Sequence, residues 1–598
     1  MWRFLPGLML CVAFGCQPPV VRDNQRPPAT EVGDDDDDTG TVIDTDIPDG
    51  PRIVVLMVGD GMGSAQLDAA SGYLHGATEA LAVYDLPHRG RLRTGGPSGI
   101  TDSAAAATAM ATGVYTHNRK IALDRDGQDR KTLVELAREV GLSTGVVSTA
   151  SLAHATPASF TAHVEDRGSY EEIAQQQLSF PPDLMFGGGA DYFGGDTAPG
   201  MEIHAGDHMD YELDRTNQPS LTEMSITALD RLEDENANGF FLVIEGARID
   251  MAGHGNDLPN VVGDTLAFDA AVTAVSEWLD SRDGTLIVTA DHETGGLTID
   301  SAPEIGVLPD VSWRWGLHTN VDVDVFGSGP GTEVIDGQLI GHPTVHAALR
   351  GRIIDEPFIA PEPVLLPDGN LAELSLVAST QTQVTDFGEG YNQLDAMLVG
   401  GDSHGLNIGF EGTFEFDANA VVVLVDTDYG GPEGHASMLG AIQDSDGDID
   451  AILAGLRLTA PADAAFAADF AVVAYGGEEV WLDALAARGG LRGLSDPTNL
   501  PWLASVVNYG VGSRDAGSSP VPGLGLEISI PWTSVYDGTP QAATIALAAV
   551  LVNDDGSYTS NQALPPFPDA NGAGPNPVAL PGVVVMTVAD GVPTLVVQ

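Results

Sequence analysis

The sequence predicts an α/β protein with a mostly parallel sheet flanked by helices, followed by a mainly β domain of the sandwich type. In the first half, uninterrupted apolar runs are typical of strands buried on both faces. These runs alternate with segments of helical periodicity, which favours a parallel sheet. In the second half, helical patterns are scarce, and short β-like runs alternate with Gly, Asp and Pro turns.

Apolar runs mark the expected strands of the sheet in chain order. They are RIVVLMVGDG (52–61), STGVVSTA (143–150), FFLVIEGA (240–247), TLIVTADH (285–292) and VDVFGSGP (323–330). Helical spacing of apolar residues predicts helices in KTLVELAREVG (131–141), DTLAFDAAVTAVSEWLDSR (264–282) and HPTVHAALRGRI (342–353). The α/β region is therefore expected to end near residue 355.

A chain of 598 residues is too long for one ordinary core, so we expect more than one domain. The predicted divisions are a signal peptide (1–16), an acidic Pro-rich linker (17–50), the α/β domain (51–355), a Pro-rich linker (356–370) and a β-sandwich (371–598).

The N-terminus MWRFLPGLMLCVAFGCQPP has one early positive charge, a short apolar stretch and small residues ending at Cys16. It resembles a bacterial lipoprotein signal, which implies export, cleavage before Cys16 and a lipid anchor on that cysteine. Gln17 then implies the outer membrane, on its periplasmic or cell-surface face. An ordinary secretory signal with an incidental cysteine is the alternative.

The formal net charge of -61 excludes nucleic-acid binding through a basic surface and attraction to anionic membranes, because both need Lys and Arg. The charge favours solubility, divalent cations or a salty habitat, and it could equally reflect genomic composition. It assigns no function by itself.

Carboxylates and imidazoles follow several of the predicted strands. They are Asp60, Glu245, Asp250, His254, Asp291 and His292. Singly, each is more simply a turn former, a solvated loop residue or half of an ion pair. Together, they are expected to meet in one crevice outside the carboxyl ends of the strands. Mixed carboxylate and imidazole ligands suit zinc-like ions with an open coordination position.

Ser103 lies in SGITDSAAAATAMATG, just before an Ala-rich segment. Its simplest interpretation is a helix N-cap. A serine at the positive end of a helix is also placed to act as a nucleophile, provided that a neighbouring group ionises its hydroxyl.

Six segments in the region 51–355 resemble the alkaline phosphatase family in their order and local spacing. They are VGDGMG, TDSAAAATAMATG, HATPASFTAHVEDR, EGARIDMAGHGND, TADHETGG and GLHTNVDVDVFGSGP. The resemblance implies an α/β enzyme that hydrolyses phosphate monoesters through a phosphoserine intermediate, with two zinc ions and one magnesium ion.

Carried over by position, the resemblance assigns metal ligands and catalytic groups. It gives one zinc to Asp250, His254 and His318, the other to Asp60, Asp291 and His292, and magnesium to Asp60, Thr156 and Glu245. Ser103 corresponds to the nucleophile and Arg167 to the phosphate clamp. Without the resemblance, His318 would be a surface histidine and Arg167 an ion-pair partner of Asp166 or Glu165.

Two positions depart from the family pattern. His154 stands where the best-known bacterial enzyme has an aspartate near magnesium, and we count it among the metal-site residues; Met251 replaces a common Lys or His. The short interval from His292 to His318 leaves little room for the crown insertion that some relatives use at a dimer interface, so a homodimer stays open.

The C-terminal region loosely resembles DOMON and family-9 carbohydrate-binding sandwiches, which implies a carbohydrate or cell-surface ligand. Trp481, Trp502 and Trp532 could stack on a sugar, although core packing is commoner. DSDGDID at Asp444–Asp450 offers the alternating carboxylates of a calcium loop, but a solvated acidic turn is the favoured interpretation.

The sequence thus predicts an exported alkaline phosphatase acting on small phosphate monoesters. One alternative is a phosphodiesterase or sulfatase of the same superfamily, although no sulfatase-like CxPxR motif surrounds Ser103. The other is a cell-surface binding protein with a vestigial catalytic domain, which the complete ligand set disfavours.

Overall fold

The computed structural model describes residues 51–361 without a break and, beyond them, 364–366, 371, 374, 376–381 and most strands between 393 and 596. The predicted signal peptide with Cys16, the acidic linker, Asp444–Asp450, Trp481 and Trp502 lie outside the described residues. None of the helices in the described part is long and apolar enough to cross a membrane.

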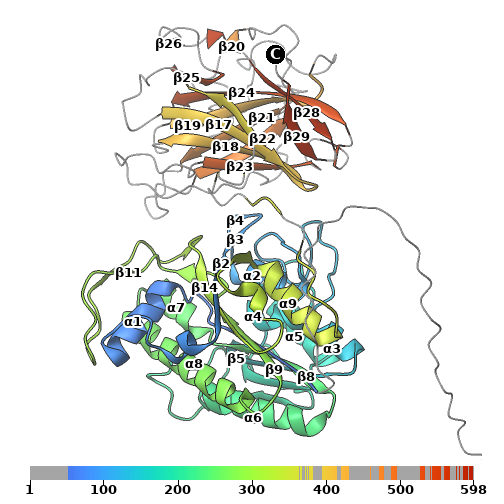
Figure 1. Cartoon of the computed structure of the whole chain (residues 1–598), viewed down its shortest axis with the longest axis vertical. Helices are drawn as coiled ribbons and strands as arrows, with labels where there is room; N and C mark the ends of the chain where they lie inside the picture. Colours follow the sequence, from blue (N-terminus) through green and yellow to red (C-terminus); the bar gives the residue numbers. More distant parts are fainter. Residues whose placement is uncertain are drawn as a thin grey trace, which may run out of the picture. The chain divides into compact units, whose positions relative to one another are not determined.

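A mostly parallel sheet forms the centre of residues 51–361, as the sequence predicts (Figure 1). Its order is β15 (Leu339–Gly341), β2 (His88–Arg93), β14 (Val323–Ser328), β9 (Gly284–Thr289), β1 (Arg52–Val58), β8 (Gly239–Glu245), β5 (Ser143–Ser151), β6 (Leu184–Gly188) and β7 (Met201–Ile203). Strand β14 runs antiparallel to both of its neighbours, while the other pairs are parallel.

Helices cover both faces of this sheet (Figure 1). They are α1 (Ser64–His75), α2 (Ser103–Thr112), α3 (Leu133–Glu139), α4 (Ala155–Thr161), α5 (Tyr170–Ser179), α6 (Leu221–Glu235), α7 (Arg248–His254), α8 (Leu258–Leu279) and α9 (His342–Ile354). Helix α8 begins six residues before its predicted start, because Asp257 caps it by accepting a hydrogen bond from Asn260 N and Pro259 fits its first turn.

The C-terminal strands form two further sheets. One has the order β16 (Leu376–Thr380), β17 (Gln393–Gly401), β18 (Gly405–Thr413) and β23 (Leu526–Pro531). The other contains β22 (Ala487–Gly493), β21 (Phe470–Gly476), β19 (Asn419–Asp426), β24 (Ala543–Asn553), β25 (Tyr558–Leu564), β26 (Gly574–Pro575), β28 (Val584–Ala589) and β29 (Val592–Leu595). Because one hydrophobic cluster contains residues of both sheets, they pack face to face as a sandwich.

Trp532 belongs to that sandwich core. Its side chain is 1% exposed, and its Nε1 donates to the carbonyl of Asp402 at 2.7 Å. A ring packed in this way cannot stack on a sugar, so of the two interpretations given for Trp532 the structure supports core packing.

Candidate metal and phosphate site

Four neighbouring parallel strands bring the expected ligands to one edge of the sheet. Strands β9, β1, β8 and β5 lie side by side, and Val58 at the end of β1 pairs with both Glu245 and Thr289. The residues that follow these strand ends, Asp60 and Asp291 among them, therefore emerge together. Both carboxylates are completely buried.

The first cluster contains Asp60, Asp291 and His292. Nε2 of His292 lies 3.7 Å from Asp60 Oδ1 and 3.2 Å from Asp291 Oδ2. Both carboxylate oxygens of Asp60 and Oδ2 of Asp291 are buried without a hydrogen-bond partner among the described residues. Burial and then the charge of Asp250 raise the pKa of Asp291 to about 7. Buried carboxylates that lack donors require a cation or a proton.

The second cluster contains Asp250, His254 and His318, and His292 lies close to Asp250 and His318 as well. Nδ1 of His254 lies 2.7 Å from the carbonyl of Gly316, and Nδ1 of His318 lies 2.9 Å from that of Thr101. A carbonyl only accepts, so each Nδ1 carries a proton, and each ring presents an Nε2 lone pair when it is neutral.

These lone pairs face each other. The two Nε2 atoms are 3.2 Å apart, and they lie 3.3 Å and 3.5 Å from oxygens of Asp250. Burial opposes protonation, but the hydrogen bond and charge of Asp250 raise the pKa of His254 to about 9, so a metal ion at this point would replace the proton on Nε2. Three acceptors aimed at one point are the donor set that a zinc-like ion uses, so the residues fit the ion.

The third cluster contains Asp60, His154 and Glu245, with Thr156 beside them. Thr156 Oγ1, Glu245 Oε1 and His154 Nδ1 are buried and without a hydrogen-bond partner in the part of the chain that the structure describes. Burial raises the pKa of Glu245 to about 7. The three oxygen-bearing side chains suit a hard cation such as magnesium, whereas imidazole is a less usual magnesium ligand.

Ser103 is the first residue of α2 and not its cap, which corrects the simplest sequence interpretation. Asp102 is the N-cap, and its side chain accepts from Ala105 N at 2.9 Å. Ser103 Oγ is therefore free of capping and lies 3.3 Å from Nε2 of His292. The ring of His292 stacks on that of His318 with centroids 3.5 Å apart, so the serine adjoins the first two clusters.

Arg167 points into the same region. Its Nη1 donates to Asp102 Oδ2 at 3.1 Å, and its Nη2 lies 3.0 Å from Nε2 of His154. The alternative ion-pair partners are engaged elsewhere, because Asp166 pairs with Arg119 and Glu165 with Lys120. The structure thus brings Arg167 to Ser103 through Asp102.

Sequence reasoning missed two residues that hold the ligands in place. Thr294 Oγ1 donates to Asp250 Oδ1 at 2.5 Å and lies 3.3 Å from Nδ1 of His292. Glu293 accepts from Gln66 Nε2 at 2.8 Å and from Thr319 Oγ1 at 2.5 Å, which ties α1 to the strand that bears His318. Both residues follow His292 directly in TADHETGG, so their position beside a ligand was the available signal.

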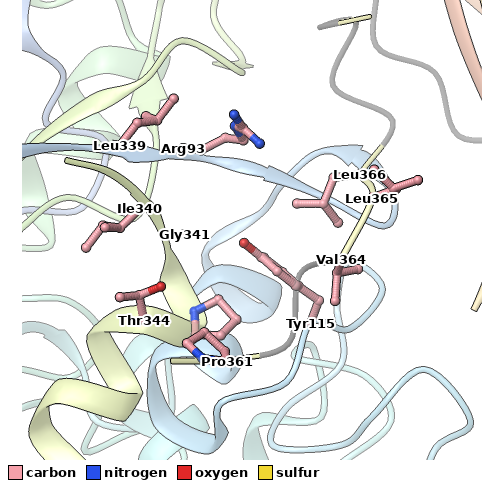
Figure 2. A pocket seen from close by; sticks show the side chains of 11 residues that line it. Arg93, Tyr115, Leu339, Ile340, Gly341, Thr344, Pro361, Val364, Leu365 and Leu366 are labelled. Atoms are coloured by element: carbon pink, nitrogen blue, oxygen red, sulfur yellow. The ribbon is translucent and has the colours of Figure 1, made fainter. Parts of the chain in front are cut away.

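A separate cavity of about 350 Å³ shares no residue with these clusters (Figure 2). It lies at the start of α9, next to the β2–β15 edge of the sheet. Its walls are Arg93, Tyr115, Leu339, Ile340, Gly341, Pro343, Thr344, Pro361, Val364, Leu365 and Leu366.

The fold and the clusters define an α/β protein with a buried metal-binding centre beside a serine at a helix N-terminus. The family model described as alkaline phosphatase matches residues 52–201 and 196–309. Streptomycin-6-phosphate phosphatase of Streptomyces griseus is 32% identical over 394 residues, which cover 48% of this chain and 87% of that protein. The chain belongs to the alkaline phosphatase family.

Other relatives are matched over a smaller share of their length. Alkaline phosphatase 4 of Bacillus subtilis is 33% identical over 294 residues, which are 42% of this chain and 64% of that protein. Across the first three relatives the chain spans 57% to 64% of their length. The structure of alkaline phosphatase from the Antarctic bacterium TAB5 is 26% identical with a TM-score of 0.46, covering 51% of this chain and 98% of that one.

Proposed function

We propose that this protein hydrolyses phosphate monoesters through a covalent phosphoserine at Ser103. The observation that carries the proposal is the convergence of three acceptors, Asp250 and the Nε2 atoms of His254 and His318, beside the serine. That convergence supports a bound cation next to a side chain that can form a bond to phosphorus.

We infer three ions from the donor sets. Zinc fits Asp250, His254 and His318 in one position, where the two Nε2 atoms lie near Asp250, and Asp60, Asp291 and His292 in the other. Magnesium fits the oxygens of Asp60, Thr156 and Glu245, with His154 adjoining. When bound, these ions supply positive charge that offsets the charge of the substrate and favours the ionised serine.

The chain's own groups then perform a double displacement. Ser103 Oγ loses its proton to solvent and bonds to phosphorus while the ester P–O bond breaks, and the leaving alkoxide takes a proton from solvent to become the alcohol. The N-terminus of α2 directs its first N–H groups toward the developing negative charge. A water oxygen next bonds to phosphorus, the serine O–P bond breaks, and Ser103 regains its proton as phosphate leaves.

Arg167 is the group suited to hold the phosphate. Its planar fork can donate to two non-bridging oxygens at once, which a lysine could not reproduce. The hydrogen bond to Asp102 fixes the fork beside Ser103 before substrate arrives, so less ordering is required on binding.

The test is p-nitrophenyl phosphate hydrolysis at alkaline pH by the mature chain, before and after chelation and with zinc and magnesium restored. Activity should vanish with the chelator, return with the metals and fall by at least 10³-fold in Ser103→Ala. Acid quenching with ³²P-labelled substrate should trap label on the wild-type protein and none on Ser103→Ala.

Ser64→Ala is the matched control, because Ser64 is also the first residue of a helix and its hydroxyl donates to Asp324 instead. It should keep activity and labelling. Metal-dependent activity that survives in Ser103→Ala would overturn the covalent step. Hydrolysis of bis-p-nitrophenyl phosphate in preference to the monoester would support the diesterase alternative.

We also propose that the protein is exported and anchored to the outer membrane through a lipid on Cys16, a proposal that rests on the N-terminal sequence alone. Metabolic labelling with palmitate in a bacterial host should mark the wild-type protein. Cys16→Ser should abolish the label and release the protein from the membrane fraction; an unlabelled wild-type protein would overturn the anchor.

A further inference from the structure

Arg248 is a cation beside the candidate site that forms no ion pair with any residue the structure describes. It begins α7, the helix that carries Asp250 and His254. Its guanidinium lies 3.8 Å above the ring of Tyr211, and Nη1 lies 2.8 Å from the sulfur of Met251, which is a weak acceptor. Its Nε is buried without a hydrogen-bond partner, and no carboxylate of the described residues forms an ion pair with it.

Several other described arginines are paired with carboxylates. Arg167 is bonded to Asp102, Arg215 to Glu212 and Arg282 to Glu233. In a protein of net charge -61, Arg248 is instead held over an aromatic ring, and no described carboxylate forms an ion pair with it. Its available charge and donors suit an anion supplied by a ligand.

His208 lies close enough to Arg248 that, besides burial, the charge of the arginine lowers the pKa of its imidazole, although Asp207 raises it. Its Nδ1 accepts from Ser151 N at 3.1 Å, so the neutral ring carries its proton on Nε2 and can donate from there. The ring meets that of His154 edge to face at 5.2 Å, and His154 in turn contacts Arg167. The Nε2 atom lies 3.7 Å from Asp207 Oδ1, which is beyond hydrogen-bond distance, and the His208 side chain is 24% exposed, so a ligand group can reach it.

We propose that Arg248, with His208 beside it, forms a subsite for a second anionic group on the alcohol part of the substrate. The inference rests on the proposed function and deepens it. The substrate class is phosphate monoesters that bear a carboxylate or another phosphate a few bonds from the scissile ester. Esters of cationic alcohols are disfavoured at the same subsite, because the guanidinium of Arg248 repels a second cation.

The experiment compares three esters on the metal-loaded mature protein at one ionic strength. Glycerol 3-phosphate has a neutral alcohol, 3-phosphoglycerate replaces its terminal CH₂OH by a carboxylate, and phosphocholine has a cationic alcohol. Wild type should show the highest kcat/KM on 3-phosphoglycerate and the lowest on phosphocholine. Arg248→Gln should lower the ratio of kcat/KM for 3-phosphoglycerate over glycerol 3-phosphate about tenfold, mainly through KM.

Two further variants separate charge from packing. Arg248→Lys keeps the charge and should keep most of the preference. Arg282→Gln is the matched control, because Arg282 also stacks on an aromatic ring, 3.6 Å above Trp278, away from the clusters. This variant should leave the relative kcat/KM values of the three esters unchanged. Raising the salt concentration should reduce the wild-type preference toward that of Arg248→Gln.

The experiment distinguishes failure of the subsite from failure of the proposed function. If Arg248→Gln changes the ratio of kcat/KM for 3-phosphoglycerate over glycerol 3-phosphate by less than twofold, Arg248 only packs on Tyr211, whether or not the melting temperature falls. That result would overturn the subsite and leave the proposed phosphatase function intact. A wild-type protein that hydrolyses none of the three esters with metals present would overturn both the proposed function and the subsite.

Discussion

Asp102 caps the helix that begins with Ser103 and at the same time holds Arg167, whose Nη1 lies 3.1 Å from Asp102 Oδ2. One carboxylate therefore fixes both the helix of the proposed nucleophile and the arginine proposed to hold the phosphate. The two roles can be separated, because asparagine caps helices about as well as aspartate does but carries no charge.

Asp102→Asn is expected to keep the cap and loosen Arg167. Inorganic phosphate should inhibit the variant several-fold more weakly than wild type, while the free energy of unfolding stays within about 0.5 kcal/mol. Asp102→Ala should lose the cap as well and be about 1 kcal/mol less stable. Phosphate inhibition and urea unfolding measure the two effects; an unchanged inhibition constant in Asp102→Asn would mean that the contact with His154 alone positions Arg167.

Thr294 is expected to set the protonation of His292. If Nδ1 of His292 donates to Thr294 Oγ1 and the hydroxyl donates on to Asp250, Nε2 is left with its lone pair toward Asp60 and Ser103. Thr294→Val removes this relay, so zinc affinity should fall about 10- to 100-fold. Thr294→Ser keeps the hydroxyl and is the control.

The measurement is zinc retained by each variant after dialysis against graded concentrations of a chelator. Retention by Thr294→Val equal to that of Thr294→Ser would show that the hydroxyl does not govern the ligand. Because zinc content is measured directly, the result does not depend on catalytic activity.

The strands of the parallel sheet and the candidate metal ligands that follow them could be predicted from the sequence. Buried parallel strands are continuous apolar runs, and the residues that follow them meet at one edge of the sheet. Asp60, Asp291 and Glu245 are examples. The sequence could not show that Asp102, and not Ser103, is the N-cap of α2, since Asp and Ser are both good caps and only backbone geometry decides between them. Nor could it place Arg248 over Tyr211, because that contact joins α7 to a loop 37 residues earlier with no local pattern.

Asp264 on α8 is a buried carboxyl whose charge should weaken the fold at alkaline pH. Burial raises its pKa to about 7, although Glu212 N donates to it and Arg215 and Arg248 lie near. The folded carboxyl holds its proton to higher pH than the unfolded one, so its contribution to stability is present below the unfolded pKa and is lost as the pH rises through 7.

Asp264→Asn removes that charge and keeps an acceptor for Glu212 N. At pH 9 it should be more stable than wild type by about 2 kcal/mol, and the difference should shrink as the pH falls toward 4. Urea unfolding at several pH values, with chelator in all samples, measures this. A variant less stable than wild type at pH 9 would show that the two arginines outweigh burial.

The sandwich offers a prediction that distinguishes core packing from sugar binding. Trp532 is 1% exposed and donates from Nε1 to the carbonyl of Asp402. Trp532→Phe keeps an aromatic ring but leaves that carbonyl without its donor and opens space, so the sandwich should lose about 1–3 kcal/mol of stability. Thermal unfolding should show a lower transition, while phosphatase activity below that transition stays the same. Binding of the mature chain to immobilised polysaccharides should be equal for both proteins below the transition; a selective loss of such binding would contradict the core role.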